Sequence, residues 1–259
     1  MLAYNDSGSG DPVLFVAGTG GAGRTWHIHQ VPAFLAAGYR CITFDIRGTA
    51  ATENAAGFST DQMIADTAEL IEQAVGGPVR LVALSMGAFV AQELMLERPD
   101  LIDQAVLMGT RGRLDQTREA FRAADLAMAE CDADLPAAYA AKIRVLEGFS
   151  PRTINSPAGR EWLEMFTAFP VRRTPGWRAQ LGVAPSVNRL PAYRSITTET
   201  LVIGFADDVL TPPELGREVA DALPNGRYVQ IADAGHLGFL ERPEAVNSAT
   251  LEFFAGHTM

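Results

Sequence analysis

The chain has 259 residues, of which 47% are hydrophobic and 20% are charged, and its formal net charge at pH 7 is −10. These proportions are ordinary for a soluble globular protein, and the length fits one large α/β domain or two small ones. The negative charge argues against nucleic acid or an anionic membrane as a partner. No apolar run approaches the roughly 20 residues of a membrane-spanning helix, and the first residues do not resemble a signal peptide. We therefore expect a cytoplasmic protein.

Short apolar runs alternate with longer helix-like segments along the chain. The runs predict strands at 13–17, 41–44, 81–84, 105–108, 201–205 and 228–231. Most are apolar throughout, as is typical of parallel strands that are covered on both faces. Helical spacing predicts helices over 59–75, 215–223 and 243–254, the first with a capping box from Ser59 to Gln62. The alternation predicts an α/β fold with a mostly parallel, doubly wound sheet.

The segment 114–193 interrupts this alternation. It contains no convincing strand, and its helical pieces are broken at Pro136, Pro151, Pro157 and Pro175. We interpret it as a helical insertion of about 80 residues over the carboxyl ends of the strands, where ligands bind in such sheets. Residues 1–113 and 194–259 would then form the core, and 114–193 a cap or lid. A separate helical domain packed elsewhere is the alternative.

The apolar run at 80–84 ends in Ser85, which Ala83 and Gly87 flank two residues away on each side. A helix-compatible run, 88–98, follows at once. A strand that reverses into a helix at one residue needs a strained backbone there, with small neighbours, and it lifts the hydroxyl clear of the sheet. The pattern predicts a nucleophile elbow. The alternative is a strand that ends at a helix-capping serine.

A serine nucleophile needs a base and a carboxylate that orients the base. His236 lies on a loop after the last predicted strand, where such a base would be expected. Asp207 and Asp208 directly follow the strand at 201–205, so one of them is the candidate acid. The chain order is then Ser, Asp, His.

The remaining histidines and the two cysteines have simpler interpretations. His27 and His29 have no accompanying carboxylate or cysteine cluster, so we expect structural roles, no metal and no cofactor. His257 lies in the C-terminal tail, where we expect it to be solvated. Cys41 and Cys131 are too few for a disulfide framework and are expected to be free thiols.

A glycine-rich loop at 18–23 follows the first long strand. It lacks the Gly-Lys-Ser/Thr ending of a phosphate loop and a well-placed acidic residue for dinucleotide binding. Glycines let the backbone approach a ligand closely and turn its N–H groups inward. If Ser85 attacks a carbonyl carbon, the N–H groups of Thr19 and Met86 would face the developing oxyanion.

Together these motifs resemble the α/β-hydrolase superfamily over essentially the whole chain, and most closely the actinobacterial cofactor-free haloperoxidase-like hydrolases. The matching motifs are the loop at 18–23, Phe44-Asp45-Ile46-Arg47-Gly48, the Ser85 turn, and the segments 204–213 and 233–236. The resemblance implies a Ser85–Asp208–His236 triad and a helical lid. It favours Asp208 over Asp207 because the following Val-Leu-Thr-Pro-Pro aligns best with Asp208 as the acid.

Three positions depart from the family pattern. Ala17 stands where the family often has histidine, so the oxyanion loop should be held differently. Ala50 replaces the last glycine of the Phe-Asp-x-Arg-Gly-x-Gly motif, which should alter a turn near the site. Ala83 replaces the first glycine of the elbow and tightens its packing. These departures leave a non-hydrolytic member of the family open.

We expect a serine-dependent hydrolase that cleaves an ester, thioester or related carbonyl compound, a small-molecule substrate of secondary or lipid metabolism. The resemblance leaves three alternatives: a lyase that eliminates acetate or is similar to the menaquinone-pathway synthase, a perhydrolase with haloperoxidase activity, and a non-enzymatic small-molecule receptor. The sequence predicts no oligomeric state.

Several side chains are candidates for substrate binding. The candidates at the site are Gly18, Arg111, Trp162 and Phe166. Further lid aromatics (Phe121, Phe169, Trp177) suggest an apolar pocket, although about half of the lid aromatics are expected to form the lid's own core. Arg113, Arg172 and Arg173 are further candidates for binding a carboxylate, although most such arginines simply solvate helices.

Overall fold

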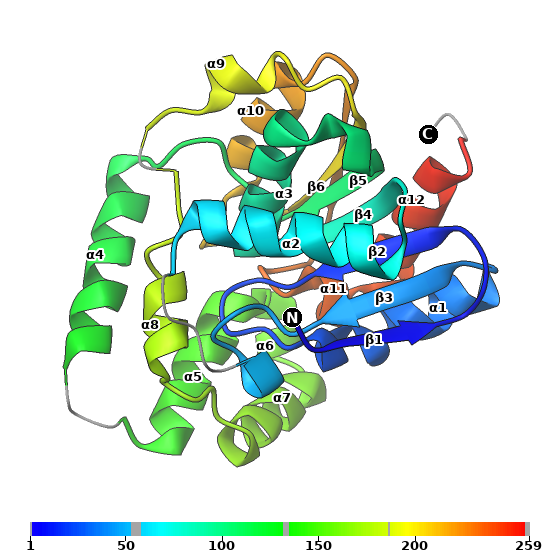
Figure 1. Cartoon of the computed structure of the whole chain (residues 1–259). Coiled ribbons are helices and arrows are strands. Elements are labelled where there is room, and N and C mark those ends of the chain that lie inside the picture. The colour runs from blue at the N-terminus through cyan, green and yellow to red at the C-terminus, as the bar shows by residue number, and fades with distance from the viewer. Residues whose placement is uncertain (1, 53–57, 132–134, 186, 257–259) are drawn as a thin grey trace.

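The computed structural model describes residues 2–52, 58–131, 135–185 and 187–256. Its centre is a seven-stranded sheet in the order β1-β3-β2-β4-β5-β6-β7, with β1 antiparallel to β3 and every other pair parallel (Figure 1). The strands are β1 (Tyr4–Ser7), β2 (Pro12–Val16), β3 (Arg40–Phe44), β4 (Val79–Leu84), β5 (Ile102–Met108), β6 (Glu199–Phe205) and β7 (Gly226–Ile231). The six predicted strands are all present, and each begins one to three residues earlier than predicted.

β1 is the strand that the sequence did not predict. Its residues are mostly exposed and polar, so they show no buried apolar run. Tertiary context supplies what the sequence lacks, since β1 pairs along the edge of β3 from Tyr4 opposite Phe44 to Ser7 opposite Cys41. An ion pair of 2.6 Å between Asp6 and Arg40 fastens the two strands at this edge.

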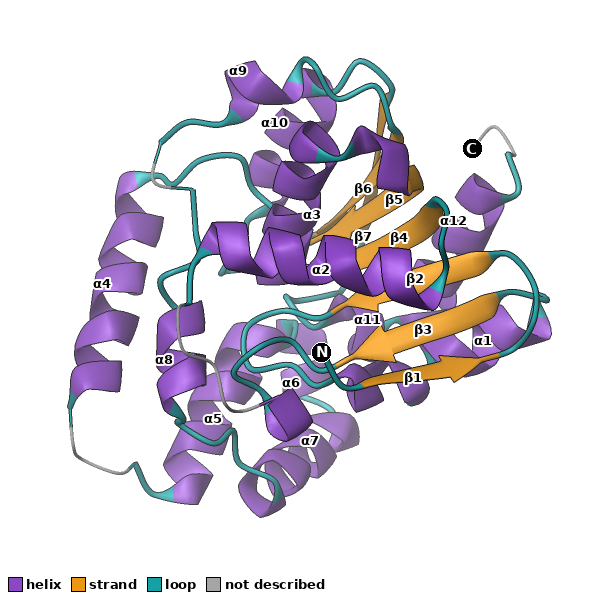
Figure 2. Cartoon of the chain, in the orientation of Figure 1, coloured by secondary structure: helices purple, strands orange, loops and turns teal. Residues whose placement is uncertain are grey.

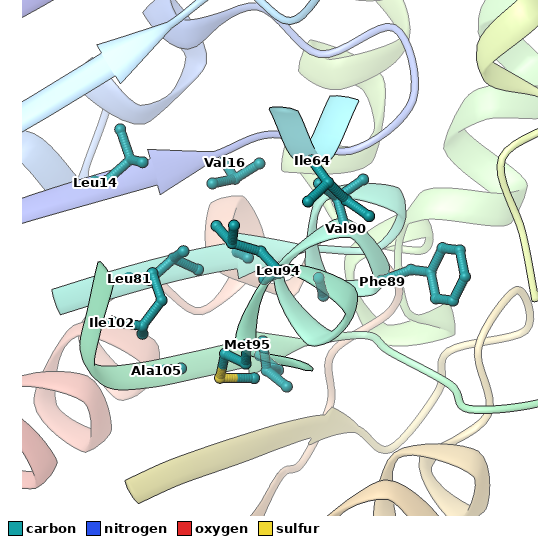
Figure 3. Close-up of a cluster of buried hydrophobic side chains, with 14 of the residues drawn as sticks. Leu14, Val16, Ile64, Leu81, Phe89, Val90, Leu94, Met95, Ile102 and Ala105 are labelled. Carbon is teal, nitrogen blue, oxygen red and sulfur yellow. The ribbon is translucent and has the colours of Figure 1, made fainter. Parts of the chain in front are cut away.

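Helices cover both faces of the sheet (Figure 2). The helices that flank it are α1 (Gln30–Ala36), α2 (Thr60–Ala74), α3 (Met86–Glu97), α10 (Pro213–Ala222), α11 (Gly238–Glu241) and α12 (Pro243–Phe254). Residues alternate between two cores along the strands. Leu14 and Leu81, for example, face the core that includes α2 and α3, whereas Phe15 and Val82 face the one that includes α1 and α12. Figure 3 shows Val90, Leu94 and Met95 of α3 against the first of these faces.

The N-terminus of α2 confirms half of the predicted capping box. The Ser59 hydroxyl accepts a hydrogen bond of 3.1 Å from the backbone N–H of Gln62. The Gln62 side chain instead donates to Asp66 at 3.0 Å. Asp66 also accepts two hydrogen bonds from Arg47, at 2.5 and 2.6 Å. The Gln62 side chain therefore binds this paired carboxylate and does not reach back to the backbone N–H of Ser59, as the second half of a capping box requires.

In the described parts of 109–198, between β5 and β6, the regular elements are all helices. These are α4 (Gln116–Glu130), α5 (Ala137–Gly148), α6 (Pro151–Ile154), α7 (Pro157–Ala168), α8 (Pro175–Gln180) and α9 (Leu190–Tyr193). The predicted proline breaks are helix starts, because proline lacks the N–H that a first turn leaves unpaired. Figure 2 shows β3 pointing toward the side of the molecule where α4, α5 and α8 lie. Short α9 instead packs against α10 and α3.

Among the described residues, no helix combines the length and the hydrophobicity that crossing a bilayer requires.

Candidate active site

Ser85 occupies the turn between β4 and α3 with φ 55° and ψ −118°, a strained conformation for a residue with a side chain. Its N–H donates to the carbonyl of Met108 at 2.9 Å, which ties the turn to the end of β5. A Cβ on Gly87 would lie 2.4 Å from the carbonyl oxygen of Ala17, so only glycine fits there. The Ser85 side chain makes no capping hydrogen bond to α3. The turn is therefore an elbow and not a capped strand end.

Asp208 and His236 form a buried pair at the carboxyl ends of β6 and β7. Asp208 Oδ2 lies 2.8 Å from His236 Nδ1, and the two residues are only 4% and 7% exposed. The backbone N–H groups of Leu210 and Thr211 each donate to Asp208 Oδ1 at 2.8 Å. These bonds fix the carboxylate, and the contact to Nδ1 leaves Nε2 as the ring nitrogen for proton exchange. Asp207 is only partly buried, and its N–H donates to the carbonyl of Ala234 at 2.9 Å.

Thr211 is a member of this group that the sequence did not single out. Its hydroxyl donates to Asp208 Oδ2 at 2.7 Å and lies 3.1 Å from His236 Nδ1. It belongs to the Val-Leu-Thr-Pro-Pro segment that favoured Asp208. That segment is the feature of the sequence that could have pointed to Thr211.

The loop that carries His236 is held by a second buried carboxylate, Glu241 of α11. Glu241 accepts a hydrogen bond of 2.7 Å from the N–H of Gly235, next to His236. It also accepts from both the backbone N–H and the hydroxyl of Ser150, at the start of α6. Glu241 therefore couples the histidine loop to the inserted helices. Nothing local in the sequence indicates this, because its partners are 6 and 91 positions away.

The loop at 18–23 is held by Gln180 of α8, which is 1% exposed. Gln180 Oε1 accepts from the N–H of Gly20 at 2.7 Å. Its Nε2 donates to the carbonyl of Arg47 at 2.9 Å and to the hydroxyl of Thr49 at 2.8 Å. The loop is thus fastened by an amide from the insertion. The expectation that a loop with Ala17 in place of histidine is held differently from the family pattern stays a prediction.

The turn at 48–50 shows what replaces the missing glycine. Ala50 has φ 44°, in the left-handed region that favours glycine. Two residues earlier, Gly48 with φ 85° lies so close to α8 that a Cβ there would be 2.6 Å from the Cα of Gly176. The departure at position 50 therefore leaves a strained turn directly beneath the inserted helix that carries Gln180.

A cavity of about 760 Å³ lies between the sheet and the inserted helices. Ser85 and His236 line it, and so do Thr19 and Met86. Met86 is the first residue of α3, so its N–H has no acceptor inside the helix. The volume is within the range of small-molecule sites. The cavity therefore brings the predicted nucleophile, base and oxyanion donors to one space.

Three of the four candidate substrate-binding residues line the cavity. Gly18, Arg111 and Phe166 line the cavity, but Trp162 is not among its lining residues. Trp162 stacks on Phe149 with ring centroids 5.0 Å apart and lies 5.6 Å from Phe166, so it packs against the hydrophobic core that includes these two rings. Among the other lid aromatics, Phe121 and Trp177 line the cavity, whereas Phe169 is 68% exposed and does not.

Of the other arginine candidates, one lines the cavity and two do not. Arg113 forms two hydrogen bonds with Glu218, at 2.7 and 2.6 Å, away from the cavity. Arg173 lines the cavity, and Arg172 does not. His27 Nε2 lies 3.0 Å from the hydroxyl of Thr43, a structural contact. Cys41 and Cys131 are free thiols, as expected. No metal-binding group of three is found in the described part of the chain, and His257 lies outside it.

The model of the alpha/beta hydrolase family matches residues 13–249. The chain belongs to this family. The family member named "Putative non-heme bromoperoxidase BpoC" of Mycobacterium tuberculosis is 64% identical over 255 residues, covering 98% of this chain and 97% of the relative. Its crystal structure superimposes with a TM-score of 0.97 and 62% identity, covering 100% of this chain and 97% of that one. This α/β hydrolase therefore has the fold and the haloperoxidase-like relatives that its sequence motifs predicted.

Two more distant solved structures carry names of enzymes. A thermophilic esterase from Thermogutta terrifontis has a TM-score of 0.84 at 27% identity, covering 99% of this chain and 94% of that one. A bromoperoxidase from Bacillus anthracis has a TM-score of 0.79 at 25% identity, covering 98% and 95%. Together with the family match, these relatives identify the chain as an α/β-hydrolase-fold enzyme.

Proposed function

We propose that this enzyme is a serine hydrolase that cleaves an ester, thioester or related carbonyl compound. Ser85 is the nucleophile, His236 the base and Asp208 the group that orients the base. The observation that carries the proposal is the buried Asp208–His236 pair of 2.8 Å, whose histidine lines the same cavity as the strained Ser85.

In the proposed reaction His236 Nε2 takes the proton of Ser85 as its oxygen attacks the carbonyl carbon. The N–H groups of Thr19 and Met86 hold the oxyanion, and losing one such donor typically costs about 10²–10³ in kcat. His236 then returns the proton to the leaving group. Water, activated by the same histidine, releases the acid from the acyl-enzyme. Asp208 stays ionised throughout and stabilises the imidazolium.

The direct test is Ser85→Ala. We expect this variant to lose turnover of p-nitrophenyl acetate and labelling by a fluorophosphonate. Ser248→Ala, which removes an exposed hydroxyl on α12, is the matched control and should keep both. Retained fluorophosphonate labelling of Ser85→Ala would overturn the assignment. Turnover in H₂¹⁸O should place the label in the released acid, whereas an elimination would leave the acid unlabelled.

A perhydrolase reaction is the second candidate, favoured by the bromoperoxidase names of two relatives. In it hydrogen peroxide, not water, attacks the acyl-enzyme and releases a peracid, which then oxidises bromide in solution. We expect bromination of monochlorodimedone to require both a carboxylic acid and Ser85. Bromination that survives Ser85→Ala would separate the two activities and exclude this route.

A further inference from the structure

We propose that the cavity recognises an anionic group of the substrate, a carboxylate or a phosphate, through Arg111, Arg118 and Arg122, the arginine cluster. The inference names a substrate class for the proposed hydrolase and so rests in part on that function. Its binding test does not require catalysis.

The cluster belongs to the wall of the catalytic cavity. Among the described residues, five arginines and two carboxylates, Asp125 and Glu147, line the cavity, although the whole chain carries a net charge of −10. Burial raises the pKa of both carboxylates and so disfavours their charged forms, and the side chains of the cluster are partly buried. The enclosed part of this wall is therefore positive in a protein that is otherwise acidic.

One face of α4 carries two members of the cluster. Arg118 and Arg122 are four residues apart and lie on the same side of the helix as Phe121, and all three line the cavity. Arg111 follows β5 and donates to the carbonyl of Leu210 at 3.3 Å. The N–H of the same Leu210 donates to Asp208. The cluster thus extends from the inserted helix to the carboxylate of the proposed triad.

The protein leaves the cluster incompletely paired. The Nε atoms of Arg118 and Arg122 are buried and have no hydrogen-bond partner among the described residues. The only ion pair of Arg118 in that part of the chain is a long contact of 3.8 Å to Asp115, and Arg122 donates to the carbonyl of Gly182 at 3.3 Å. Unpaired buried donors are costly, and a planar guanidinium binds carboxylate or phosphate oxygens in pairs.

Electrostatic repulsion within the arginine cluster also favours a bound anion. Burial lowers the pKa of Arg111, and the neighbouring charges of Arg118 and Arg122 lower it further, while Asp208 and Asp115 act in the opposite direction. Three guanidinium groups in one wall repel one another, and a bound anion would relieve that repulsion. An exclusively apolar substrate would leave the repulsion in place and would also cover these donors without pairing them.

The binding test uses the Ser85→Ala protein in isothermal titration calorimetry with three probes: monomethyl glutarate, butyl phosphate and the neutral ester methyl butyrate. We expect at least one anion to bind about tenfold tighter than the neutral ester. Arg118→Gln and Arg122→Gln should each remove about tenfold of that affinity and leave methyl butyrate unchanged. Arg160→Gln, an exposed arginine on α7, is the matched control and should change nothing.

A salt titration keeps the test independent of whether the arginine variants fold. Affinity of the Ser85→Ala protein for the anionic probe should fall as ionic strength rises, and affinity for methyl butyrate should not. Whichever of monomethyl glutarate and butyl phosphate binds more tightly shows whether the cavity recognises a carboxylate or a phosphate. Equal affinity for all three probes, or equal losses for anionic and neutral probes in the arginine variants, would overturn the proposal.

Kinetics separate this inference from the proposed function. With the unmodified enzyme, 4-nitrophenyl hydrogen glutarate should have a KM about tenfold lower than 4-nitrophenyl butyrate. Equal KM values for two hydrolysed esters would refute anion recognition and leave the hydrolase intact. Tight anion binding without turnover of either ester would refute the hydrolase and leave anion recognition intact.

Discussion

Gln180 offers the sharpest test of how the insertion contributes to the site. Gln180→Met keeps the length and volume of the side chain but removes its acceptor and its donor. The N–H of Gly20 then loses a hydrogen bond of 2.7 Å, and the carbonyl of Arg47 loses one of 2.9 Å. The hydroxyl of Thr49 loses its bond of 2.8 Å but can turn to another acceptor.

The magnitude follows from the two backbone groups. A buried donor or acceptor left without a partner costs about 1–3 kcal/mol. Both groups here are partly buried, so water can reach them, and we expect a loss of roughly 2–3 kcal/mol in the free energy of unfolding. Because Gly20 follows Thr19 directly, we also expect the oxyanion loop to relax and kcat to fall about tenfold or more, with a smaller change in KM.

The assay combines urea unfolding, followed by circular dichroism, with kcat and KM on p-nitrophenyl acetate. Gln73→Met, on the exposed side of α2, is the control and should leave both unchanged. Thr49→Val should reproduce only a minor part of the stability loss. A Gln180→Met protein with the stability and the kcat of the unmodified enzyme would refute the claim that this amide fastens the loop.

Three further outcomes are expected. Asp208→Asn should lower kcat by about 10⁴-fold while Asp207→Asn changes it little, and similar losses in both would contradict the assigned acid. Glu241→Gln presents one acceptor oxygen in place of two, so urea unfolding should show a free energy of unfolding lower by roughly 1–2 kcal/mol. An unchanged unfolding transition would contradict the claim that Glu241 holds the histidine loop. Burial raises the pKa of Cys41 to about 12, so iodoacetamide at mildly alkaline pH should label Cys131 alone until urea exposes Cys41, which mass spectrometry can verify.

Local patterns predicted most of the framework because their physical causes are local. Parallel strands buried on both faces must be apolar throughout, and prolines mark helix starts, so the sheet and the inserted helices are visible in the sequence. β1 is not, since an exposed edge strand needs no apolar pattern. Its formation depends on the neighbouring edge of β3.

The candidate site likewise contains residues that the local sequence predicted and residues that it did not. The elbow at Ser85 is a property of five consecutive residues, and the carboxyl ends of parallel strands meet at one edge, so Asp208 and His236 could be expected near it. Trp162 was misplaced as a lining residue. Its helical spacing indicates that it faces inward but not whether the cavity or the hydrophobic core around Phe149 and Phe166 lies there.

The sequence by itself thus determined the α/β-hydrolase fold, the turn at Ser85 and the order of the proposed triad. The family resemblance favoured Asp208 over Asp207, but only the tertiary structure shows the contact of Asp208 with His236, because the directions of adjacent side chains depend on the geometry of a single turn. It also decided that Gln180 holds the loop at 18–23 and that three arginines line one cavity. These contacts join residues far apart in the chain, and their energy depends on burial and distance, which no local pattern encodes.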